Sequence, residues 1–541
     1  ASDIEKLAPK STADLFKAIP GVWVESSGGE SGANVFVRGF PGGGDAPFLT
    51  IALENSPIYP APTLSFLENS QLFRIDDTIE MVEGLRGGPN PVVSNGQPGL
   101  TTNFRLKRGG ESTEASAKYT ISDYGLNRID VVASGALDDD LYYMVGGYIK
   151  SSEGIRDAGF NSEQGNQFTV NITKVFEKGE LNLYTRQTDD RGTWYLPTPL
   201  NVEGIDANYT QIGPLNRQGT ITYGPNDTTE SFDFGEGRGW DGHVSGGSIK
   251  LDLGNDWQLV DRFNLTKGEA NTFGLVPNGS ATTVANVADN GESATGAVTG
   301  TVYDGDTPIQ QIGRWVVLKD IEAFTNDLAV SKSWEDFDTS FGIYSASTKA
   351  NDWWSIGNTA YHVLQPGGEL LDGIECNTDA QGCDWNYDIS SVGDASTLAL
   401  YATGTWYATT DLSIDLGLRR ENHEVNYSVD EDLDGKITKA LEYDETKTSW
   451  TVGANYALND TSGVFVRMNR GYKMPYFDDF RDNWGAYTGG NDLIQEVTQG
   501  ELGYKFMNDS IQFFATAFAN EVKGDTFVRR PGAPAEILTN E

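Results

Sequence analysis

One acidic stretch of the chain carries the residue types and spacing of a cation-binding loop. In Asp430-Glu431-Asp432-Leu433-Asp434-Gly435, side-chain oxygens stand at positions one, three and five, and a glycine at position six. A calcium loop uses this pattern and ends with a glutamate at position twelve. Here the glutamate comes one residue later, at Glu442. The stretch predicts either a structural Ca²⁺ site made by Asp430, Asp432, Asp434 and Glu442 or a solvated acidic hairpin tip.

The two cysteines, Cys376 and Cys383, lie close together in a polar, glycine-containing stretch. A zinc site would need further ligands, and the only three histidines stand in three separate segments. The cysteines therefore predict a disulfide that pins a loop in an oxidising compartment, with two free thiols as the alternative. No nucleophile motif accompanies the histidines, so we expect neither an enzyme nor a required cofactor.

Charge and hydropathy narrow the class of protein further. The formal net charge is −39, which argues against nucleic acid as a partner because phosphate binding needs clustered Lys and Arg. No apolar run approaches the roughly 20 residues of a membrane-spanning helix. The start at Ala1 shows no basic and apolar leader, so we expect a signal peptide to lie outside this chain. If the protein is in a membrane, it must span it as a β-barrel.

From about residue 113 onward, apolar and polar residues alternate with the period of a β-strand. Residues 411–419 place four aliphatic side chains on one face and polar or small residues on the other, and the same pattern recurs at 168–173, 181–186 and 511–518. Each segment is typical of a strand buried on one face only. A soluble β-sandwich would alternate in the same way.

The lengths of the connections distinguish a barrel from a sandwich. Short turn signals occur near residues 138–140, 177–179, 254–256, 334–336, 409–410, 459–460 and 508–509. Between them lie longer connections at about 189–241, 268–315, 348–395, 424–445 and 471–493. Short turns at one rim and long loops at the other are typical of an outer-membrane barrel. We count about 15 strands, with a sixteenth starting near Ala535.

The first 110 residues differ from this pattern and indicate a small α+β domain. A capped amphipathic helix begins at Ser11 and stops before Pro20. A glycine-rich stretch then leads to a strand at 35–40, and further strand patterns follow at 79–86 and 101–108. A domain of this size suits the inside of a wide barrel.

Over nearly its whole length the sequence resembles the TonB-dependent outer-membrane receptors, on motifs that occur in the family's order. The motifs are Pro20-Gly21-Val22, Val37-Arg38-Gly39-Phe40, Ile79-Glu80-Met81-Val82-Glu83-Gly84-Leu85-Arg86-Gly87, Asn103-Phe104, Arg470-Gly471-Tyr472-Lys473-Met474-Pro475 and Glu501-Leu502-Gly503-Tyr504-Lys505. The resemblance implies a plug domain at 1–110 inside a transmembrane β-barrel at 111–541, integral to the bacterial outer membrane and in contact with its lipid. Residues 52–57 and 94–100 depart from the family pattern, which indicates a distant subfamily.

The family expectation of about 22 strands implies that the barrel's C-terminal strands lie beyond residue 541. The short peptide that engages TonB normally precedes the plug, and nothing before Ile4 matches it. We therefore expect the sequence to be incomplete at both ends, with the TonB-binding peptide outside it.

The resemblance also implies a mechanism, in which TonB and its inner-membrane energising complex pull on the plug and open a path. Arg38 and Arg86 resemble plug arginines that face barrel carboxylates, and Glu501 is the matching barrel residue. Such charge-assisted contacts hold in a confined site yet can be re-solvated. Ordinary packing of the arginines in β-turns is the alternative.

Ligand is expected to meet the plug apex and the extracellular loops, where exposed aromatic rings suit stacking on sugars or on catecholate and hydroxamate groups. The candidate residues are Asp45, Tyr59, Trp194, Tyr195, Trp353, Trp354, Trp385, Trp484 and Tyr487. Packing of the loops on themselves, or anchoring at the membrane interface, is the alternative for about half of them. The function implied is uptake of a scarce nutrient, with a ferric siderophore as the family default. An oligosaccharide, cobalamin or a passive porin-like channel are the alternatives.

Overall fold

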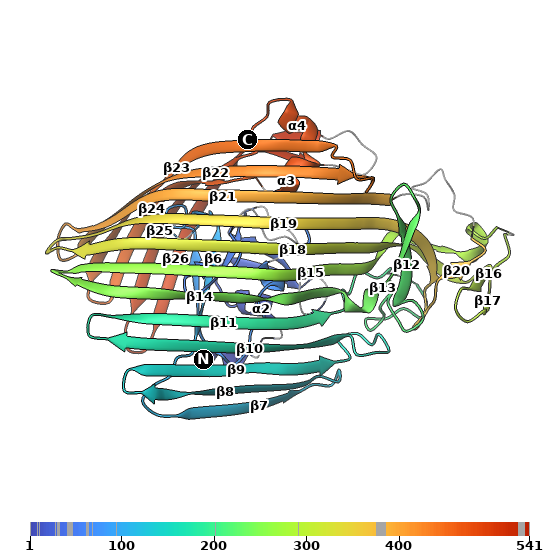
Figure 1. Cartoon of the computed structure of the whole chain (residues 1–541), viewed down its shortest axis with the longest axis horizontal. Coiled ribbons are helices and arrows are strands. Elements are labelled where there is room, and N and C mark those ends of the chain that lie inside the picture. Colours follow the sequence, from blue (N-terminus) through green and yellow to red (C-terminus); the bar gives the residue numbers. More distant parts are fainter. Residues whose placement is uncertain are drawn as a thin grey trace.

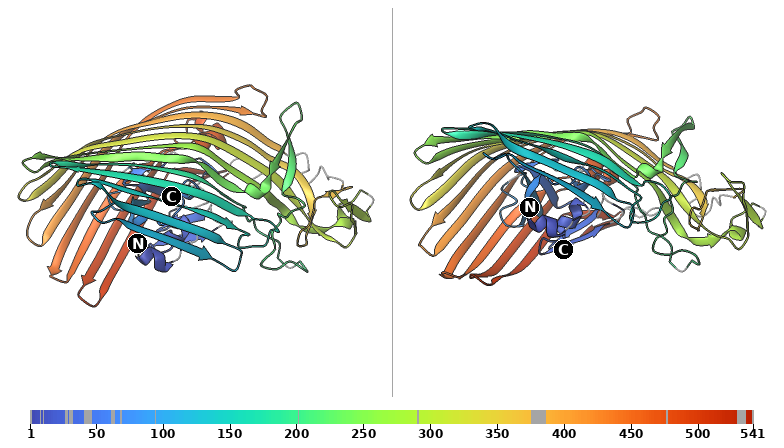
Figure 2. Two further views of the ribbon diagram at one scale, coloured as in Figure 1. Left: turned by 60° about the horizontal axis from the view of Figure 1, so that its bottom comes forward. Right: turned by 90° about the horizontal axis from the view of Figure 1, so that it is seen from below.

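The chain forms a large antiparallel β-sheet that curves around a small domain made by its N-terminal residues (Figures 1 and 2). The computed structural model describes residues 2–7, 9, 11–26, 29, 33–40, 47–60, 64–67, 69–93, 95–200, 202–289, 291–374, 386–475, 477–528 and 536–539. The small domain and the sheet correspond to the predicted fold class, a plug of mixed α and β structure inside an antiparallel barrel wall, which is confirmed.

The N-terminal domain combines short helices with two small sheets. Its elements are α1 (Ser2–Leu7), α2 (Thr12–Phe16), β1 (Val22–Ser26), β2 (Ala33–Val37), β3 (Leu49–Leu53), β4 (Ser56–Pro57), the 3-10 turn η1 (Asn69–Gln71), β5 (Ile79–Arg86) and β6 (Leu100–Leu106). Ser11 and Asp14 form a capping box that fixes the start of α2. The strands β4, β3, β6 and β5 form one sheet, and β1 pairs with β2 in the other.

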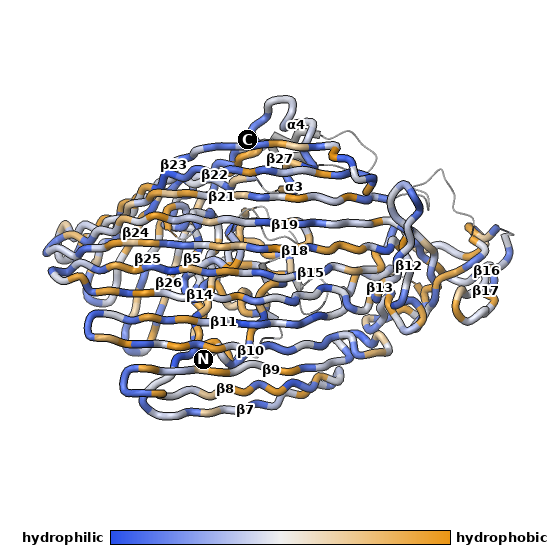
Figure 3. The backbone as a smooth tube through the Cα atoms, in the orientation of Figure 1, coloured by the Kyte–Doolittle hydropathy of each residue, from blue (hydrophilic) through white to orange (hydrophobic). Residues whose placement is uncertain are grey.

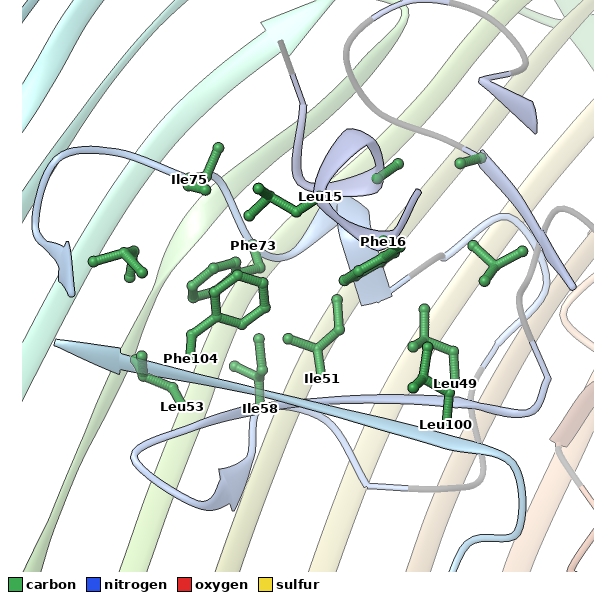
Figure 4. Close-up of a cluster of buried hydrophobic side chains, with 14 of the residues drawn as sticks. Leu15, Phe16, Leu49, Ile51, Leu53, Ile58, Phe73, Ile75, Leu100 and Phe104 are labelled. Carbon is green, nitrogen blue, oxygen red and sulfur yellow. The ribbon is translucent and has the colours of Figure 1, made fainter. Parts of the chain in front are cut away.

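An apolar core holds this domain together. Leu15 and Phe16 of α2 pack over Ile51 of β3 and over the rings of Phe73 and Phe104, which lie 4.3 Å apart (Figure 4). All five side chains are almost completely buried. Burying an aliphatic or aromatic side chain contributes about 1.5–3 kcal/mol, so this core gives the domain a stable centre of its own.

Fifteen strands make up the large sheet, and each pairs antiparallel with the next along the chain. They are β7 (Glu114–Ile121), β8 (Asn127–Asp138), β9 (Leu141–Ser152), β10 (Glu163–Phe176), β11 (Gly179–Gly192), β14 (Arg238–Gly254), β15 (Trp257–Thr283), β18 (Pro308–Ser333), β19 (Phe337–Val363), β21 (Asn386–Tyr407), β22 (Leu412–Glu431), β23 (Lys439–Asn459), β24 (Ser462–Lys473), β25 (Gln495–Met507) and β26 (Gln512–Lys523). Among the described residues, β7 and β26 are its two edges, and β27 (Asp525–Val528) pairs with β28 (Glu536–Thr539) apart from it.

Apolar and polar residues alternate along much of the large sheet (Figure 3), and successive side chains of a strand point to opposite faces, so the two faces differ in polarity. On β21, Leu398 and Leu400 are more than half exposed on the outer face, whereas Thr397 and Ala399, which alternate with them, are buried against the interior. The aliphatic side chains point outward and the polar ones inward, whereas a β-sandwich buries its aliphatic side chains between two sheets. This arrangement is the one a lipid-facing barrel wall requires.

The connections sort by length onto two rims, as the sequence predicts. Seven short turns lie at one end of the sheet, which we call the short-turn rim, at residues 139–140, 177–178, 255–256, 334–336, 408–411, 460–461 and 508–511. At the other end, the long-loop rim, the connections contain β12 (Gln218–Tyr223), β13 (Thr228–Asp233), η2 (Phe234–Glu236), η3 (Val284–Asn286), β16 (Ser293–Gly296), β17 (Val302–Asp304), β20 (Leu371–Asp372), α3 (Phe477–Asp482) and α4 (Trp484–Thr488).

The long connections are shorter than predicted because several strands continue further. β15 and β19 each run for 27 residues, far beyond the 9–11 that cross a bilayer. Outside lipid both faces of a strand meet water or loops, so the apolar–polar alternation fades while the backbone pairing continues. None of the helices in the described part of the chain is long and apolar enough to cross a membrane.

We expect Leu400→Arg to destabilise the sheet in lipid by about 2–4 kcal/mol, because Leu400 faces outward about 23 Å along β21 from the short-turn rim, near the bilayer midplane. Leu458→Arg, also exposed but at that rim, is the matched control and should cost about 0–1 kcal/mol. Urea unfolding in lipid vesicles measures both. Equal costs at the two positions would contradict a lipid-facing outer surface.

Candidate functional site

Arg38 and Glu501, predicted as a contact between the N-terminal domain and the sheet, meet in the structure. Arg38 follows β2 with a left-handed backbone (φ 46°), and its Nη1 lies 2.9 Å from Glu501 Oε1 on β25. Both side chains are largely buried. The Gly88 backbone N–H also donates to Glu501 (3.1 Å), and Asn520 of β26 donates to the Arg38 carbonyl (2.7 Å). The contact therefore joins the domain to two neighbouring strands.

Arg86, the third residue predicted for this contact, has a different partner. It donates to the Pro20 carbonyl within the N-terminal domain, and no ion pair joins it to a carboxylate among the residues that the structure describes. Burial lowers the pKa of Arg86, and the positive charge of Arg38 lowers it further, against an opposing effect of Glu501. Arg38 forms the ion pair with Glu501, and the hydrogen bond of Arg86 links β5 to the turn at Pro20.

A larger buried contact lies on the opposite wall, between the segment 70–78 and strands β9 to β11. Arg74 Nε lies 2.7 Å from Asp190 Oδ1, and Lys150 Nζ lies 2.8 Å from Asp190 Oδ2. The Tyr148 hydroxyl donates to the same Oδ2 at 2.6 Å. All four side chains are nearly inaccessible to solvent. One carboxylate of the sheet thus binds one cation from each side of the boundary.

Asp76 makes the reciprocal contact from the N-terminal domain. Its Oδ1 lies 2.8 Å from Arg186 Nη2 of β11, and its Oδ2 accepts from Gln167 of β10 at 2.6 Å. Burial by itself would raise the pKa of Asp76, but the Arg186 charge and hydrogen bonds from Thr78 and Gln167 outweigh it and hold the pKa below its ordinary value. Arg186 also lies over the Phe73 ring at 4.7 Å. The segment is fixed by complementary charges on both sides.

Sequence reasoning missed this network, although a signal was present. Arg186 occupies an inward position of the strand pattern at 181–186, and a charge at such a position needs a partner. Asp190 falls in the connection predicted at about 189–241, although the structure continues β11 to Gly192. The partner segment lies just before the family motif at residues 79–87, and no role for Arg74 or Asp76 was predicted from the sequence. Which inward charge meets which segment depends on how the sheet curves around the domain.

At the long-loop rim, aromatic rings converge on Phe66 of the N-terminal domain. Phe66 has a left-handed backbone (φ 57°), and its ring centroid lies 6.2 Å from Trp194, 5.8 Å from Trp315 and 5.1 Å from Trp354. Phe66, Trp194 and Trp315 keep part of their surface exposed. We call these four residues the apex aromatic cluster. Trp194 and Trp354 were predicted as ligand contacts, and Phe66 and Trp315 were not.

Tyr59, predicted as an exposed ligand contact at the apex, is instead buried. It is 1% exposed, and among the described residues its hydroxyl has no hydrogen-bond partner. Burial raises the pKa of Tyr59, as do the nearby carboxylates of Asp478 and Asp352. Tyr59 lies in one buried cluster with Phe477 and Phe480 of α3, which folds inward from the long-loop rim and stacks Phe477 on Tyr427 of β22 at 5.5 Å.

Charged residues attach α3 to the apex. The Asp478 carboxylate accepts from the Ser65 backbone N–H and lies 2.9 Å from Arg481 Nη1. Arg481 lies over the Trp354 ring at 4.2 Å, and Trp354 Nε1 donates to Asp352. Burial by itself would lower the pKa of Arg481. The neighbouring carboxylates, of which Asp478 has the largest effect, outweigh the burial and raise the pKa. One network of ion pairs and hydrogen bonds therefore joins the connection that contains α3, the wall of the sheet and the N-terminal domain.

Two further predicted ligand contacts are used to pack the loops. The Tyr195 ring is buried, and its hydroxyl lies 2.6 Å from the Ser162 hydroxyl. Burial raises the pKa of Tyr195 to about 12. Trp353 lies edge-on to Tyr223 of the β12–β13 hairpin at 5.0 Å. These rings follow the alternative prediction, in which the loops pack on themselves.

The remaining aromatic candidates lie on α4. Tyr487 packs edge-on against Phe480 of α3 at 5.2 Å, and Trp484 lies 6.1 Å from Tyr487. Both keep part of their surface exposed at the mouth. Four predicted residues lie outside the described residues: Asp45, Trp385, Cys376 and Cys383.

The acidic stretch forms the tip of the β22–β23 hairpin. The Asp430 carboxylate accepts from the backbone N–H groups of Asp434 and Gly435, and Asp434 pairs with Lys436. Glu442 lies on β23 opposite Asn426 and does not join the aspartates. Within the described ranges, no group of three or more His, Cys, Asp and Glu side chains is arranged to hold a metal. The geometry is that of the acidic hairpin tip, and calcium binding stays a prediction.

The polar lumen, the apolar outer face and the domain held inside by buried charges define a plugged β-barrel of the outer membrane. The plug family, described as TonB-dependent Receptor Plug Domain, matches residues 1–101, and the family described as TonB dependent receptor-like, beta-barrel matches residues 176–536. The chain belongs to the TonB-dependent receptors, which are transport receptors. Its short-turn rim therefore faces the periplasm and its long-loop rim the exterior.

Solved structures share the fold at low sequence identity. The ferric yersiniabactin uptake receptor FyuA from Yersinia pestis is 15% identical, with a TM-score of 0.64 over 97% of this chain and 71% of that chain. The unliganded ferric citrate transporter FecA is 11% identical, with a TM-score of 0.66 over 96% and 69%. The ferric preacinetobactin receptor BauA from Acinetobacter baumannii is 13% identical, with 0.63 over 99% and 72%. No curated protein sequence matches the chain.

We expect Asp190→Asn to loosen the plug more than Glu501→Gln. Removing the Asp190 charge leaves two buried cations without their shared partner, at a cost of about 3–5 kcal/mol. Glu501→Gln leaves one cation, Arg38, without its carboxylate and keeps an oxygen that can accept from the Gly88 N–H, so we expect a smaller cost of about 1.5–3 kcal/mol. The urea concentration at which the plug becomes sensitive to protease in intact membranes measures both. A larger effect of Glu501→Gln would reverse the ranking of the two contacts.

Acid is expected to release the Asp76 contact. Because the folded-state pKa of Asp76 lies below its ordinary value of 3.8, its stabilisation is complete above that value and is lost as pH falls through the lower folded pKa. In Asp76→Asn this part of the pH dependence of the urea midpoint should vanish. An unchanged dependence in Asp76→Asn would contradict the assignment.

Proposed function

We propose that this receptor takes up a ferric siderophore that carries aromatic, anionic iron-binding groups, driven by TonB. The observation that carries the proposal is the apex aromatic cluster, with guanidinium groups directly over two of its rings. Arg238 Cζ lies 4.8 Å from the Trp194 ring centroid, and Arg481 lies over Trp354. Partly exposed rings offer stacking and edge contacts, and the nearby cations suit a ligand with net negative charge.

The position of the cluster also favours this reading. Phe66 belongs to the plug, whereas the three tryptophans belong to the barrel wall and its loops. A ligand that touches all four residues would contact both domains at once. Its binding could therefore bias how the plug sits, since a ligand shifts a conformational equilibrium only through contacts that differ between the two states.

The polar boundary between plug and barrel suits energised opening. Arg38 with Glu501, and Asp76 with Arg186, are ion pairs that water can replace once the domains separate, whereas an apolar interface would resist such exposure. TonB, pulling from the periplasmic side, would supply the work. A passive porin would have no use for a lumen filled by a plug of this kind.

Similar structures carry names that agree with this substrate class. Receptors for ferric yersiniabactin and ferric preacinetobactin and a transporter of ferric citrate share the fold, and so does a copper transporter. At 11–15% identity these names support the proposal without fixing the ligand. An oligosaccharide is the second candidate, because the Asp352 carboxylate next to Trp354 could accept hydroxyl hydrogen bonds beside a stacking ring.

Growth distinguishes the candidates. A deletion strain should lose growth under iron limitation on at least one catecholate or phenolate ferric siderophore, and iron should repress expression of the receptor. Loss of growth on a glycan with expression induced by that glycan would overturn the siderophore proposal in favour of an oligosaccharide. Loss of growth on cobalamin alone would do so in favour of that ligand.

We expect Phe66→Ala to weaken binding of the identified ferric siderophore about 3- to 10-fold, because one aromatic contact contributes about 0.5–1.5 kcal/mol. Trp354→Phe should weaken it less, since a ring remains. Trp334→Ala at the short-turn rim is the control and should bind as the wild type does. Binding of ⁵⁵Fe-labelled complex to whole cells measures all three. An unaffected Phe66→Ala variant would exclude the apex aromatic cluster as the ligand site.

A further inference from the structure

The β12–β13 hairpin lies against the outer face of the large sheet, on the side of the strands away from the plug (Figures 1 and 2). Successive side chains of a strand point to opposite faces. Trp315 of β18 points inward to Phe66, so Val316 next to it points outward. Val316 is nevertheless fully buried, in one apolar cluster with Ile221 of β12 and Phe273 of β15. The hairpin therefore forms a second protein layer outside this part of the wall.

Strand β19 shows the same division at two neighbouring tryptophans. The Trp354 ring lies inward, 5.1 Å from the ring of Phe66, whereas the Trp353 ring lies outward, edge-on to Tyr223 of β12 at 5.0 Å. Trp353 and Trp354 share one stretch of backbone, so the contact that holds Trp353 from outside also limits the movement of Trp354 inside. A precise binding site needs side chains that a supporting layer locks in this way.

Side chains of the large sheet bind the backbone of the hairpin. The Thr222 N–H donates to Asn358 Oδ1 at 2.6 Å, and Asn386 Nδ2 donates to the Thr222 carbonyl at 3.0 Å. The Gly224 N–H, just after β12, donates to Asp388 Oδ2 at 2.9 Å. Asn358 has a left-handed backbone (φ 46°) and stands where the β18–β19 pairing is irregular. Such a bulge re-aims a side chain, here towards the hairpin. Strands β19 and β21 thus hold β12 directly.

The end of the hairpin continues into residues that hold Trp194. After β13 the chain makes η2, and the Thr193 hydroxyl donates to the Gly235 carbonyl of η2 at 2.9 Å. Gly237 has a positive φ (55°), and a Cβ there would stand 2.4 Å from the Trp194 backbone nitrogen. Arg238, the next residue, lies over the Trp194 ring at 4.8 Å. The hairpin is therefore linked, through adjacent residues, to all three tryptophans of the apex aromatic cluster.

The length of these strands explains why such a layer is needed. Strands β15 and β19 run for 27 residues, whereas about 9–11 cross a bilayer, so their parts near the long-loop rim have no lipid against the outer face. A single sheet there would carry the inward tryptophans on backbone that nothing supports from outside. The hairpin supplies that support on the side of β18 and β19 opposite to the plug.

We propose that the β12–β13 hairpin is an external brace that fixes the spacing of Trp194, Trp315 and Trp354 and thereby helps to select the ligand. Tyr223 and Asn358 are its principal positioning residues. Rings that are already fixed lose little freedom when a ligand binds, and a fixed spacing favours the ligands that match it. The inference rests on the proposed function in taking the apex aromatic cluster as the ligand site, but the surroundings of the rings can be measured without a ligand.

Fluorine NMR of purified receptor labelled with fluorotryptophan reports the surroundings of each ring. Tyr223→Ala/Asn358→Gly, which we call the brace variant, removes the ring against Trp353 and the amide that binds β12. Glycine accepts the left-handed backbone at residue 358. We expect the Trp315 and Trp354 signals, assigned by replacing each residue with phenylalanine, to shift and broaden. The signals of the tryptophans at the short-turn rim should stay unchanged.

Two control variants separate the brace from a general loss of stability. Thr220→Ala/Ser231→Ala changes the same two strands on their solvent-facing side, where the two exposed hydroxyls lie 2.9 Å apart, and should give the wild-type spectrum. Tyr223→Phe keeps a ring against Trp353 and should also give the wild-type spectrum. Unchanged apex signals in the brace variant, or equal changes in the first control, would overturn the brace.

Ligand binding separates this inference from the proposed function. The brace variant should bind the ⁵⁵Fe-labelled siderophore that supports growth about 2- to 10-fold more weakly for each freed ring, because the ligand must then order that ring. Normal binding together with shifted signals would place the ligand outside the apex aromatic cluster and overturn the proposed function, while the positioning of the rings by the hairpin would stand. If the brace variant does not fold, Asn358→Gly compared with Ser231→Ala gives the same test with smaller shifts.

Discussion

The strands of the large sheet are constrained by the absence of water around the membrane-facing wall. Backbone N–H and C=O groups in lipid must pair with other backbone groups, so the chain extends, pairs antiparallel and places alternate side chains outward and inward. The outward set becomes aliphatic, as at Leu398 and Leu400. The inward set is then free to be polar and charged. The plug and the ion pairs at its boundary both depend on that polar interior.

The polar interior gives the plug two different boundaries. On the β9–β11 wall, barrel and plug exchange charges through Asp190 and Asp76, each of which binds a cation from the other domain. At β22, Arg419 lies 2.5 Å from Glu421, and Gly96 of the plug approaches so closely that a Cβ there would stand 2.6 Å from Arg419 Nε. The plug is therefore joined to one part of the wall by exchanged charges and fitted to another by close backbone approach.

At the apex, aromatic residues that are close in sequence differ in their exposure to solvent. Phe66 remains partly exposed where Trp194 and Trp354 converge, whereas Tyr59, only seven residues earlier, is covered by α3. The Asp478 carboxylate of α3 binds the backbone of Ser65, next to Phe66. A ligand at the apex aromatic cluster would therefore lie beside the contact that ties an outer loop to the plug.

Much of the architecture could be predicted because local sequence patterns specify it. The period of two residues, the short turns at one rim and the order of the plug motifs identify the barrel, the plug and the family. Contacts between individual side chains were harder to predict from the sequence. The contact of Arg38 with Glu501 was predicted from the resemblance to the family. Arg86 was predicted to join the same contact, but it donates to the Pro20 carbonyl. Of the predicted loop aromatics, Tyr195 and Trp353 pack within the loops, and their sequence context gives no sign of which rings remain exposed.

The sequence alone established the class of protein, the alternation of faces along the recognised strand segments and the presence of charges in need of partners. Which charges meet depends on the folded arrangement. Arg74 and Asp190 are 116 residues apart, and Ser65 and Asp478 are 413 apart. Alternation fixes the face on which a side chain lies, but its partner depends on strand register, on the curvature of the wall and on the rotation of the plug within it. These arise only when all strands pair around the same core.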